Sequence, residues 1–355
     1  YKSKQEDFIV EEFLDFPFSH EGEHHYLQIS KCNLNTADVV EKLAAFCGIK
    51  VRDIGYSGLK DKRAWTTQWF SVYLAGKKLN DIDWKIIESF DWRQGEIKLR
   101  QAVLHNKKLK RSTHKRNAFT LLLRKLNGSV CEQSSLASVL RQRMNQIEKE
   151  GFPNYFGRQR FGINDGNLQQ AERLLIGKRK ITRAKRSLYL SSVRSFLFNE
   201  ILSCRVKAQS WNNYISGDRL VLDGSKSFFS IKKEEQAQQL AILSDRLNRT
   251  DIHVGGILAG MDGLGVDNGI EYTEQEKEVI ERYESFKLLL DNNQMVPGVR
   301  PFRAMPTNVS VKNMPDGVLV KFSLPAGSFA TALLRELGEF SEYIDQRQHG
   351  IHLKC

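Results

Sequence analysis

Apolar residues along this chain recur at two spacings, one typical of helices and one typical of strands. From Asn35 to Cys47 they return every three to four residues, between a capping residue and Gly48, which predicts an amphipathic helix. From Trp65 to Leu74 the residues alternate and are rich in Thr, Trp, Phe, Val and Tyr, which predicts a strand. Asp61 therefore lies on a connection between a helix and a strand.

The same two patterns continue to the end of the chain. They predict a strand at 118–126, helices at 134–150, 192–207 and 273–290, and a strand, a small-residue turn and a helix within 317–337. Thr273 and Glu276 form a capping-box pair at the start of the last long helix. The segment MVPGVRPFRAMP holds three of the seven prolines and is predicted to be a linker.

Length and charge restrict the class of protein. With 355 residues and 41% apolar content, the chain is long enough for two globular domains. Its 54 Lys and Arg against 42 Asp and Glu give a formal charge of +12, which indicates a polyanionic partner, either nucleic acid or an anionic membrane surface. It has neither an apolar run of about 18 residues nor the apolar core of a signal peptide, so we expect a cytoplasmic protein that does not enter the membrane. Because the sequence opens on Tyr1, we also expect a few residues upstream.

Cysteine and histidine spacing argues against a metal site. The five cysteines are scattered, odd in number and contain no C-x-x-C pair, so neither a disulfide framework nor structural zinc is expected. The three histidines of SHEGEHH have no second set of ligands elsewhere in the sequence to complete a site. We therefore expect no bound metal.

Two segments carry candidate chemistry. In GYSGLKDKRAWTTQWFSV a single acid, Asp61, lies among Lys60, Lys62 and Arg63, either as part of a solvated turn or as a carboxylate that nearby cations keep ionised before a polyanion. In FPNYFGRQRFG, aromatic, amide and arginine side chains provide stacking faces and phosphate contacts together, or else buried aromatics beside exposed arginines.

Together with three other segments, these motifs resemble the TruD family of tRNA pseudouridine synthases, in its bacterial form. The matching pieces are K-x-x-x-E-D-F-I-V-E at 2–11, GLKDKRAWTTQWFS, HKRNAFTLLLR at 114–124, NYFGRQRFG and LPAGSFATALLREL. Their order also agrees, and the resemblance spans nearly the whole chain.

The resemblance implies a fold and a set of site residues. The fold is α+β, a pseudouridine synthase catalytic domain with a mostly antiparallel sheet flanked by helices, formed by 1–179 and 304–355, with an inserted α+β TRUD-type domain at 180–303. Asp61 matches the catalytic aspartate. Lys2, Phe8, Asn154, Phe156 and Phe329 match the residues expected to bind the substrate. Lys60, Arg63 and Arg158 are further binding candidates because of their own charge, without a role carried over from the family.

The implied activity is that of an RNA-modifying isomerase. It converts uridine 13 in the D arm of tRNA to pseudouridine on a flipped-out nucleotide, and it requires no cofactor. We expect a monomer with tRNA as its partner. The alternative is a non-catalytic RNA-binding or RNA-chaperoning protein with the same basic and aromatic surface. A nucleobase deaminase is disfavoured because the H-x-E and P-C-x-x-C zinc signature is absent.

Overall fold

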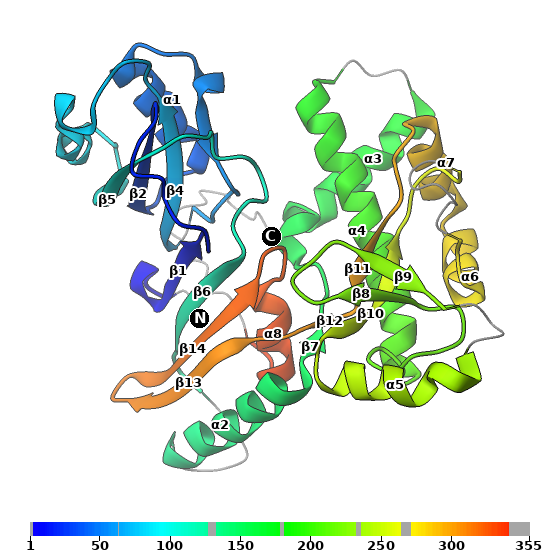
Figure 1. Ribbon diagram of the computed structural model, residues 1–355. Helices are drawn as coiled ribbons and strands as arrows, with labels where there is room; N and C mark the ends of the chain where they lie inside the picture. The colour runs from blue at the N-terminus through cyan, green and yellow to red at the C-terminus, as the bar shows by residue number, and fades with distance from the viewer. Residues whose placement is uncertain are drawn as a thin grey trace, which may run out of the picture. The chain divides into compact units, whose positions relative to one another are not determined.

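The protein forms two compact units (Figure 1). The computed structural model describes residues 3–62, 64–126, 133–177, 181–231, 236–263 and 271–340. The first unit comprises Tyr1–Lys149, Pro306–Ala326 and Leu337–Cys355, and the second comprises Glu150–Met305 and Gly327–Glu336. The predicted insertion, 180–303, lies within the second unit, which also takes in the NYFGRQRFG segment. The predicted domain limits themselves stay a prediction.

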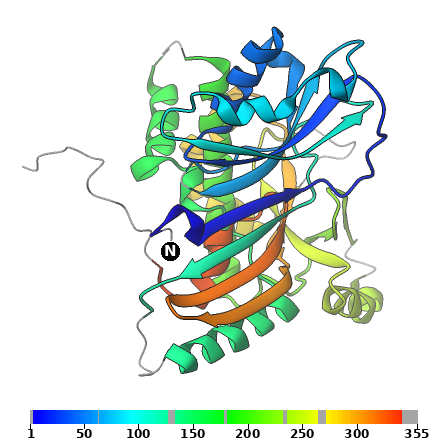
Figure 2. The same cartoon turned by 90° about the vertical axis from the view of Figure 1, so that its left-hand side faces the viewer.

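An eight-stranded mixed sheet forms the first unit, in the order β13–β14–β6–β1–β4–β2–β5 with β3 beside β4. Its strands are β1 (Phe8–Phe13), β2 (His24–Cys32), β3 (Ile54–Tyr56), β4 (Trp65–Tyr73), β5 (Glu96–His105), β6 (Arg116–Leu123), β13 (Thr307–Met314) and β14 (Gly317–Pro325). Every pair is antiparallel except β1 and β4, which run parallel. Figure 2 shows β1 in dark blue, β6 in teal and the β13–β14 hairpin in orange as successive strands. The predicted fold class is confirmed.

Helix α1 (Thr36–Cys47) covers one face of this sheet and matches the helix predicted from the sequence. Its start is fixed where the Asn35 N–H donates to the Asp38 carboxylate over 2.8 Å. It ends at Gly48, whose φ of 64° is the left-handed conformation that glycine adopts without strain. The apolar side of α1 packs onto β2 and β4, and α2 (Gln133–Glu150) bonds to β13 through Arg141.

The second unit contains a smaller, antiparallel sheet in the order β11–β10–β8–β9. Its elements are β7 (Phe152–Pro153), α3 (Gly166–Ile176), α4 (Arg183–Lys207), β8 (Arg219–Leu222), β9 (Phe228–Ser230), α5 (Gln236–Asn248), β10 (Ile252–Leu258), α6 (Glu274–Arg282), α7 (Glu284–Asn292), β11 (Gly298–Pro301), β12 (Arg303–Ala304) and α8 (Ala330–Leu337). Val193, Leu197 and Ile201 of α4 are fully buried in the core that they share with β10 and α7. A short antiparallel pair, β7 with β12, stands apart from this sheet.

Three elements differ from the sequence prediction. The helix expected at 273–290 is two helices, because the backbone leaves the helical conformation at Tyr283. Helix α4 begins at Arg183, well before the predicted residue 192. The segment predicted as a linker, 295–306, holds β11 and β12. Proline is compatible with β11 because this strand lies at the edge of its sheet, where a missing N–H leaves no ladder bond unmade.

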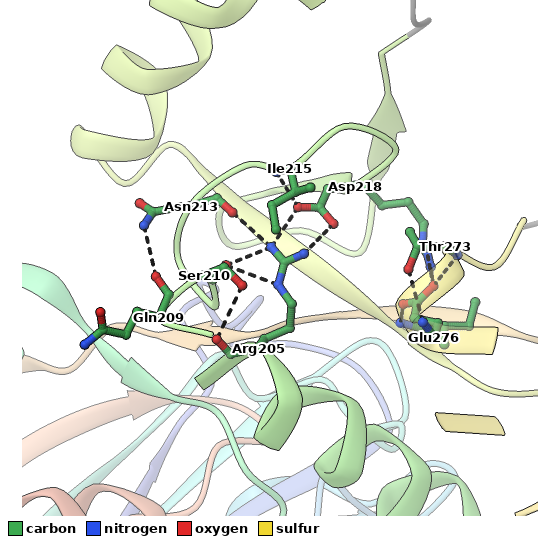
Figure 3. A network of polar contacts seen from close by, with 10 residues as sticks. Arg205, Gln209, Ser210, Asn213, Ile215, Asp218, Thr273 and Glu276 are labelled. Atoms are coloured by element: carbon green, nitrogen blue, oxygen red, sulfur yellow. Dashed lines mark hydrogen bonds and ion pairs between the residues drawn. The ribbon is translucent and has the colours of Figure 1, made fainter. Parts of the chain in front are cut away.

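Buried ion pairs join the helices of the second unit to its sheet (Figure 3). Arg205, at the end of α4, donates to both oxygens of Asp218 over 3.0 and 2.8 Å and to backbone carbonyls of the intervening turn. Arg219 of β8 pairs with Glu276 at the start of α6. Since each of these four side chains is at most 5% exposed, the partners depend on one another for their hydrogen bonds.

We expect Asp218→Ala to lower the free energy of unfolding by about 3–5 kcal/mol, because it leaves the Arg205 guanidinium buried without its carboxylate. The matched control is Asp245→Ala, which breaks an exposed pair with Arg249 and should cost less than about 1 kcal/mol. Urea unfolding followed by circular dichroism measures both losses. Similar losses in the two variants would contradict the role given to the buried pair.

Candidate active site

Asp61 lies on the connection from β3 to β4, and the described residues 57–62 of this connection, here called the Asp61 loop, are bonded to buried polar side chains. Gln68 of β4 donates through its Nε2 to the carbonyl of Gly58 over 3.3 Å and accepts the Thr36 hydroxyl over 2.9 Å. Thr36 accepts in turn the N–H of Lys60 over 3.2 Å. One strand and the start of α1 therefore fix the backbone of this loop.

Lys60 forms an ion pair with Glu12 inside the first unit. The Nζ of Lys60 lies 2.6 Å from the Glu12 carboxylate, and the two side chains are 7% and 0% exposed. The parallel ladder of β1 with β4 ends at Glu11, and the other carboxylate oxygen of Glu12 accepts the N–H of Trp69 over 3.3 Å. This geometry favours a role for Lys60 in ordering the loop, and the phosphate contact expected from the sequence stays a prediction.

Ser57 and His114 fasten the other end of the loop. The N–H of His114 donates to the Ser57 hydroxyl over 2.7 Å, and that hydroxyl lies 2.6 Å from Nδ1 of the same histidine. Burial and the charge of Lys60 lower the pKa of His114, which favours a neutral ring whose Nδ1 accepts the hydroxyl hydrogen. Ser112 adds a backbone bond to the carbonyl of Ser57 over 2.8 Å.

Lys31 of β2 bonds to the backbone of Asp61, and the sequence analysis did not predict it as a site residue. Its side chain is fully buried, and its Nζ donates to the carbonyls of Leu34 over 2.7 Å and of Asp61 over 3.3 Å. Burial lowers the pKa of Lys31 to about 8, while the charge of Asp61 acts in the opposite direction. The sequence does hold a signal: apolar Leu27 and Ile29 alternate with polar Gln28 and Ser30, so Lys31 falls on the side of the strand that Leu27 and Ile29 share.

The other predicted residues of the first unit occupy different surroundings. Asp61 is partly exposed at the end of its anchored loop. Phe8 begins β1, the strand that pairs with β4, and packs edge-on against Phe119 with the ring centroids 6.2 Å apart. Lys2 and Arg63 lie outside the described residues.

In the second unit, Asn154, Phe156 and Phe329 gather around Arg300, which the sequence analysis did not single out. The guanidinium of Arg300 lies 4.0 Å from the centroid of the Phe156 ring and donates to the Asn154 side-chain oxygen over 2.6 Å. Phe329 meets Phe156 edge-on at 5.8 Å. Burial and the charge of Arg160 lower the pKa of Arg300 to about 9, so it remains a cation at neutral pH.

The residues around Arg300 differ in how much of their surface is exposed. Phe156 is 8% exposed and belongs to the core of the second unit, whereas Phe329 keeps part of its surface accessible and Arg158 is exposed. A Cβ on Gly157 would come within 2.9 Å of the Phe329 ring, so a glycine is needed for the two segments to approach. Phe329 and Arg158 therefore offer more surface to a ligand than Phe156 does.

A basic loop, residues 106–115, packs against β3 beside the Asp61 loop. The loop contains no acidic residue. Its five cations are exposed: Lys107, Lys108, Lys110, Arg111 and Lys115. Leu109 anchors it in the core, and the Arg111 guanidinium stacks over the Tyr56 ring at 4.7 Å. Exposed cations on a fixed backbone are suited to contacting phosphates.

Within the described residues, no group of three or more His, Cys, Asp or Glu side chains is arranged to hold a metal ion. In the same part of the chain, no helix combines the length and apolar character that crossing a membrane requires. Cys32, Cys47 and Cys204 are free thiols.

Comparisons with known proteins agree along the chain. The model of the family tRNA pseudouridine synthase D (TruD) matches residues 1–184 and 176–337. A tRNA pseudouridine synthase D of Methylococcus capsulatus is 40% identical over 337 residues, which cover 94% of this chain and 89% of that protein. A tRNA pseudouridine synthase D of Proteus mirabilis is 37% identical over 338 residues, which cover 95% of this chain and 91% of that protein. A TruD structure from Methanosarcina mazei aligns with a TM-score of 0.65 over 95% of this chain and 92% of that one; at 20% identity this is a similarity of fold.

The variant Lys60→Met distinguishes loop ordering from phosphate binding. It leaves the fully buried Glu12 without its cation, so we expect the free energy of unfolding to fall by about 3–5 kcal/mol. Lys62→Met, at an exposed position of the same loop, is the control and should change stability by less than about 0.5 kcal/mol. Chemical unfolding measures stability and filter binding measures RNA affinity. Weaker RNA binding by Lys60→Met at unchanged stability would instead support the phosphate contact.

Proposed function

Because the chain belongs to the TruD family of tRNA pseudouridine synthases, we propose that it isomerises uridine 13 in the D arm of tRNA to pseudouridine, with Asp61 as its catalytic residue. The observation that carries the assignment is the anchored loop of Asp61. Asp61, a partly exposed residue, follows directly on backbone that Thr36 and Gln68 hold in place. Such support from hydrogen-bonded neighbours keeps a reacting group in one orientation.

The reaction is balanced within the substrate. The N1–C1′ bond of uridine breaks, the detached uracil turns, C5 bonds to C1′, and the proton lost from C5 is matched by one gained at N1. No oxidant, reductant or cofactor is required. The Asp61 carboxylate acts either as a nucleophile or as a base toward the sugar, and a closed site retains the detached uracil.

The substrate-binding roles of Lys2, Phe8, Asn154, Phe156 and Phe329 are part of this proposal and rest on the family motifs. Since a stacked base is out of reach, the nucleotide is flipped out and its base stacks on an aromatic ring, for which Phe329 offers the more accessible surface. The proposal also includes a cytoplasmic monomer without metal or cofactor.

The variant Asp61→Asn tests the catalytic role. It keeps the shape of the side chain but removes the charge, so we expect single-turnover pseudouridine formation to fall by at least about a thousandfold while tRNA affinity stays within about threefold. Asp53→Asn, on the 3₁₀ turn before β3, is the control and should retain the wild-type rate. Unmodified tRNA transcripts are incubated with each variant, and pseudouridine is mapped by chemical probing. A wild-type rate for Asp61→Asn would contradict the assignment, and wild-type protein that binds tRNA without modifying it would favour the RNA-chaperone alternative.

The basic loop 106–115 should contribute to the salt dependence of tRNA binding. We expect the pair Lys107→Ala and Lys110→Ala to reduce the slope of log Kd against log salt by about 1.4–1.8, the value for two lost phosphate contacts. The control pair, Lys312→Ala and Lys321→Ala, removes the same charge from exposed positions of β13 and β14 and should change the slope less. An equal change in both pairs would show that only net charge matters.

A further inference from the structure

Lys31 is a fully buried lysine whose charge is not paired in the usual way. Among the described residues Lys31 forms no ion pair: its hydrogen bonds go to two backbone carbonyls, and the charges of Asp61 and Asp38 act on it without such contact. A buried cation without an ion pair in direct contact is unfavourable for folding, because the charge loses its hydration. Because stability does not explain a lysine at this position, we looked to its hydrogen bonds for a functional role.

The two carbonyls indicate what Lys31 does. The Leu34 carbonyl belongs to the short turn between β2 and α1, and the Asp61 carbonyl belongs to the loop 57–62. The other anchors of the loop hold Ser57, Gly58 and Lys60, which precede Asp61. Lys31 therefore extends this support to the residue that carries the carboxylate.

We propose that Lys31 is a positioning residue for Asp61: its buried ammonium holds the Asp61 carbonyl, which fixes the peptide plane next to the side chain and thereby the direction of the carboxylate. The inference rests on the proposed catalytic role of Asp61. It assigns Lys31 no contact with substrate. A lysine suits this role because its ammonium, on a long and flexible side chain, reaches both carbonyls from β2.

Neighbouring charges make this contact depend on pH. Asp61 and Asp38 attract the Lys31 ammonium, Lys60 repels it, and the thiol of Cys32 lies beside it in the chain. With a pKa lowered to about 8, Lys31 is mostly protonated at neutral pH and loses its charge as the pH rises through this value. Its hold on the Asp61 carbonyl should weaken over the same range.

The experiment compares wild-type protein with Lys31→Met, which has a similar volume but cannot donate. Lys42→Met is the matched control, since Lys42 contacts Trp92 on the same core, 4.8 Å from its ring centroid, and has no bond to the loop. For Lys31→Met we expect the single-turnover rate at saturating tRNA to fall roughly ten- to a hundredfold, with the Kd for tRNA unchanged. Lys42→Met should have the single-turnover rate and the Kd for tRNA of the wild-type protein.

Two further measurements separate positioning from general stability. Hydrogen exchange of residues 57–62, read by mass spectrometry, should be faster in Lys31→Met but not in Lys42→Met. The wild-type rate should fall as the pH rises through about 8, and this loss should be absent in Lys31→Met. If Lys31→Met does not fold, the wild-type pH profile still decides, because a rate that does not fall near pH 8 overturns the proposal.

Failure of this inference differs from failure of the proposed function. An inactive Asp61→Asn together with a fully active Lys31→Met, or with unchanged exchange at 57–62, overturns the role of Lys31 alone. A fully active Asp61→Asn overturns the catalytic assignment on which this inference rests.

Discussion

The ion pair of Glu12 with Lys60 links the first strand of the chain to the loop that ends in Asp61, within the interior of the large sheet. A buried pair of this kind adds little net stability, because both groups lose their hydration. The pair instead joins elements: the Glu12 carboxylate, just past the end of the β1–β4 ladder, accepts the Trp69 N–H of β4 and pairs with Lys60 of the loop. The single parallel pairing of the sheet and the position of the Asp61 loop thus depend on each other.

Local pattern predicted the elements whose periodicity was clear. Helix α1 has a cap, an apolar stripe and a terminal glycine within one short segment, so its limits followed from neighbouring residues alone. The break at Tyr283 and the strands within 295–306 did not follow, because they depend on packing and on pairing with distant strands. Only a tertiary contact decides whether a proline-rich segment serves as a linker or as a sheet edge.

In the candidate site, too, local sequence indicated some residues, whereas others depend on contacts with distant parts of the chain. Asp61 was found from its charge context and from the resemblance, but its supports are distant in the chain: Glu12 lies 48 residues from Lys60, and Lys31 lies 30 residues from Asp61. Arg300, 146 residues from Asn154, was missed for the same reason. The aromatic residues of NYFGRQRFG were ambiguous from composition, and the structure places Phe156 in the core while leaving Arg158 exposed.

The basic loop 106–115 has a thermodynamic consequence. Five like charges on ten residues repel one another, and Leu109 holds the loop against the sheet in spite of that repulsion. A polyanion that binds the folded loop and not the unfolded chain raises the free energy of unfolding by RT ln(1 + [L]/Kd). With such a ligand, the melting temperature of the protein reports how much of it is bound, and it can be read without following a reaction.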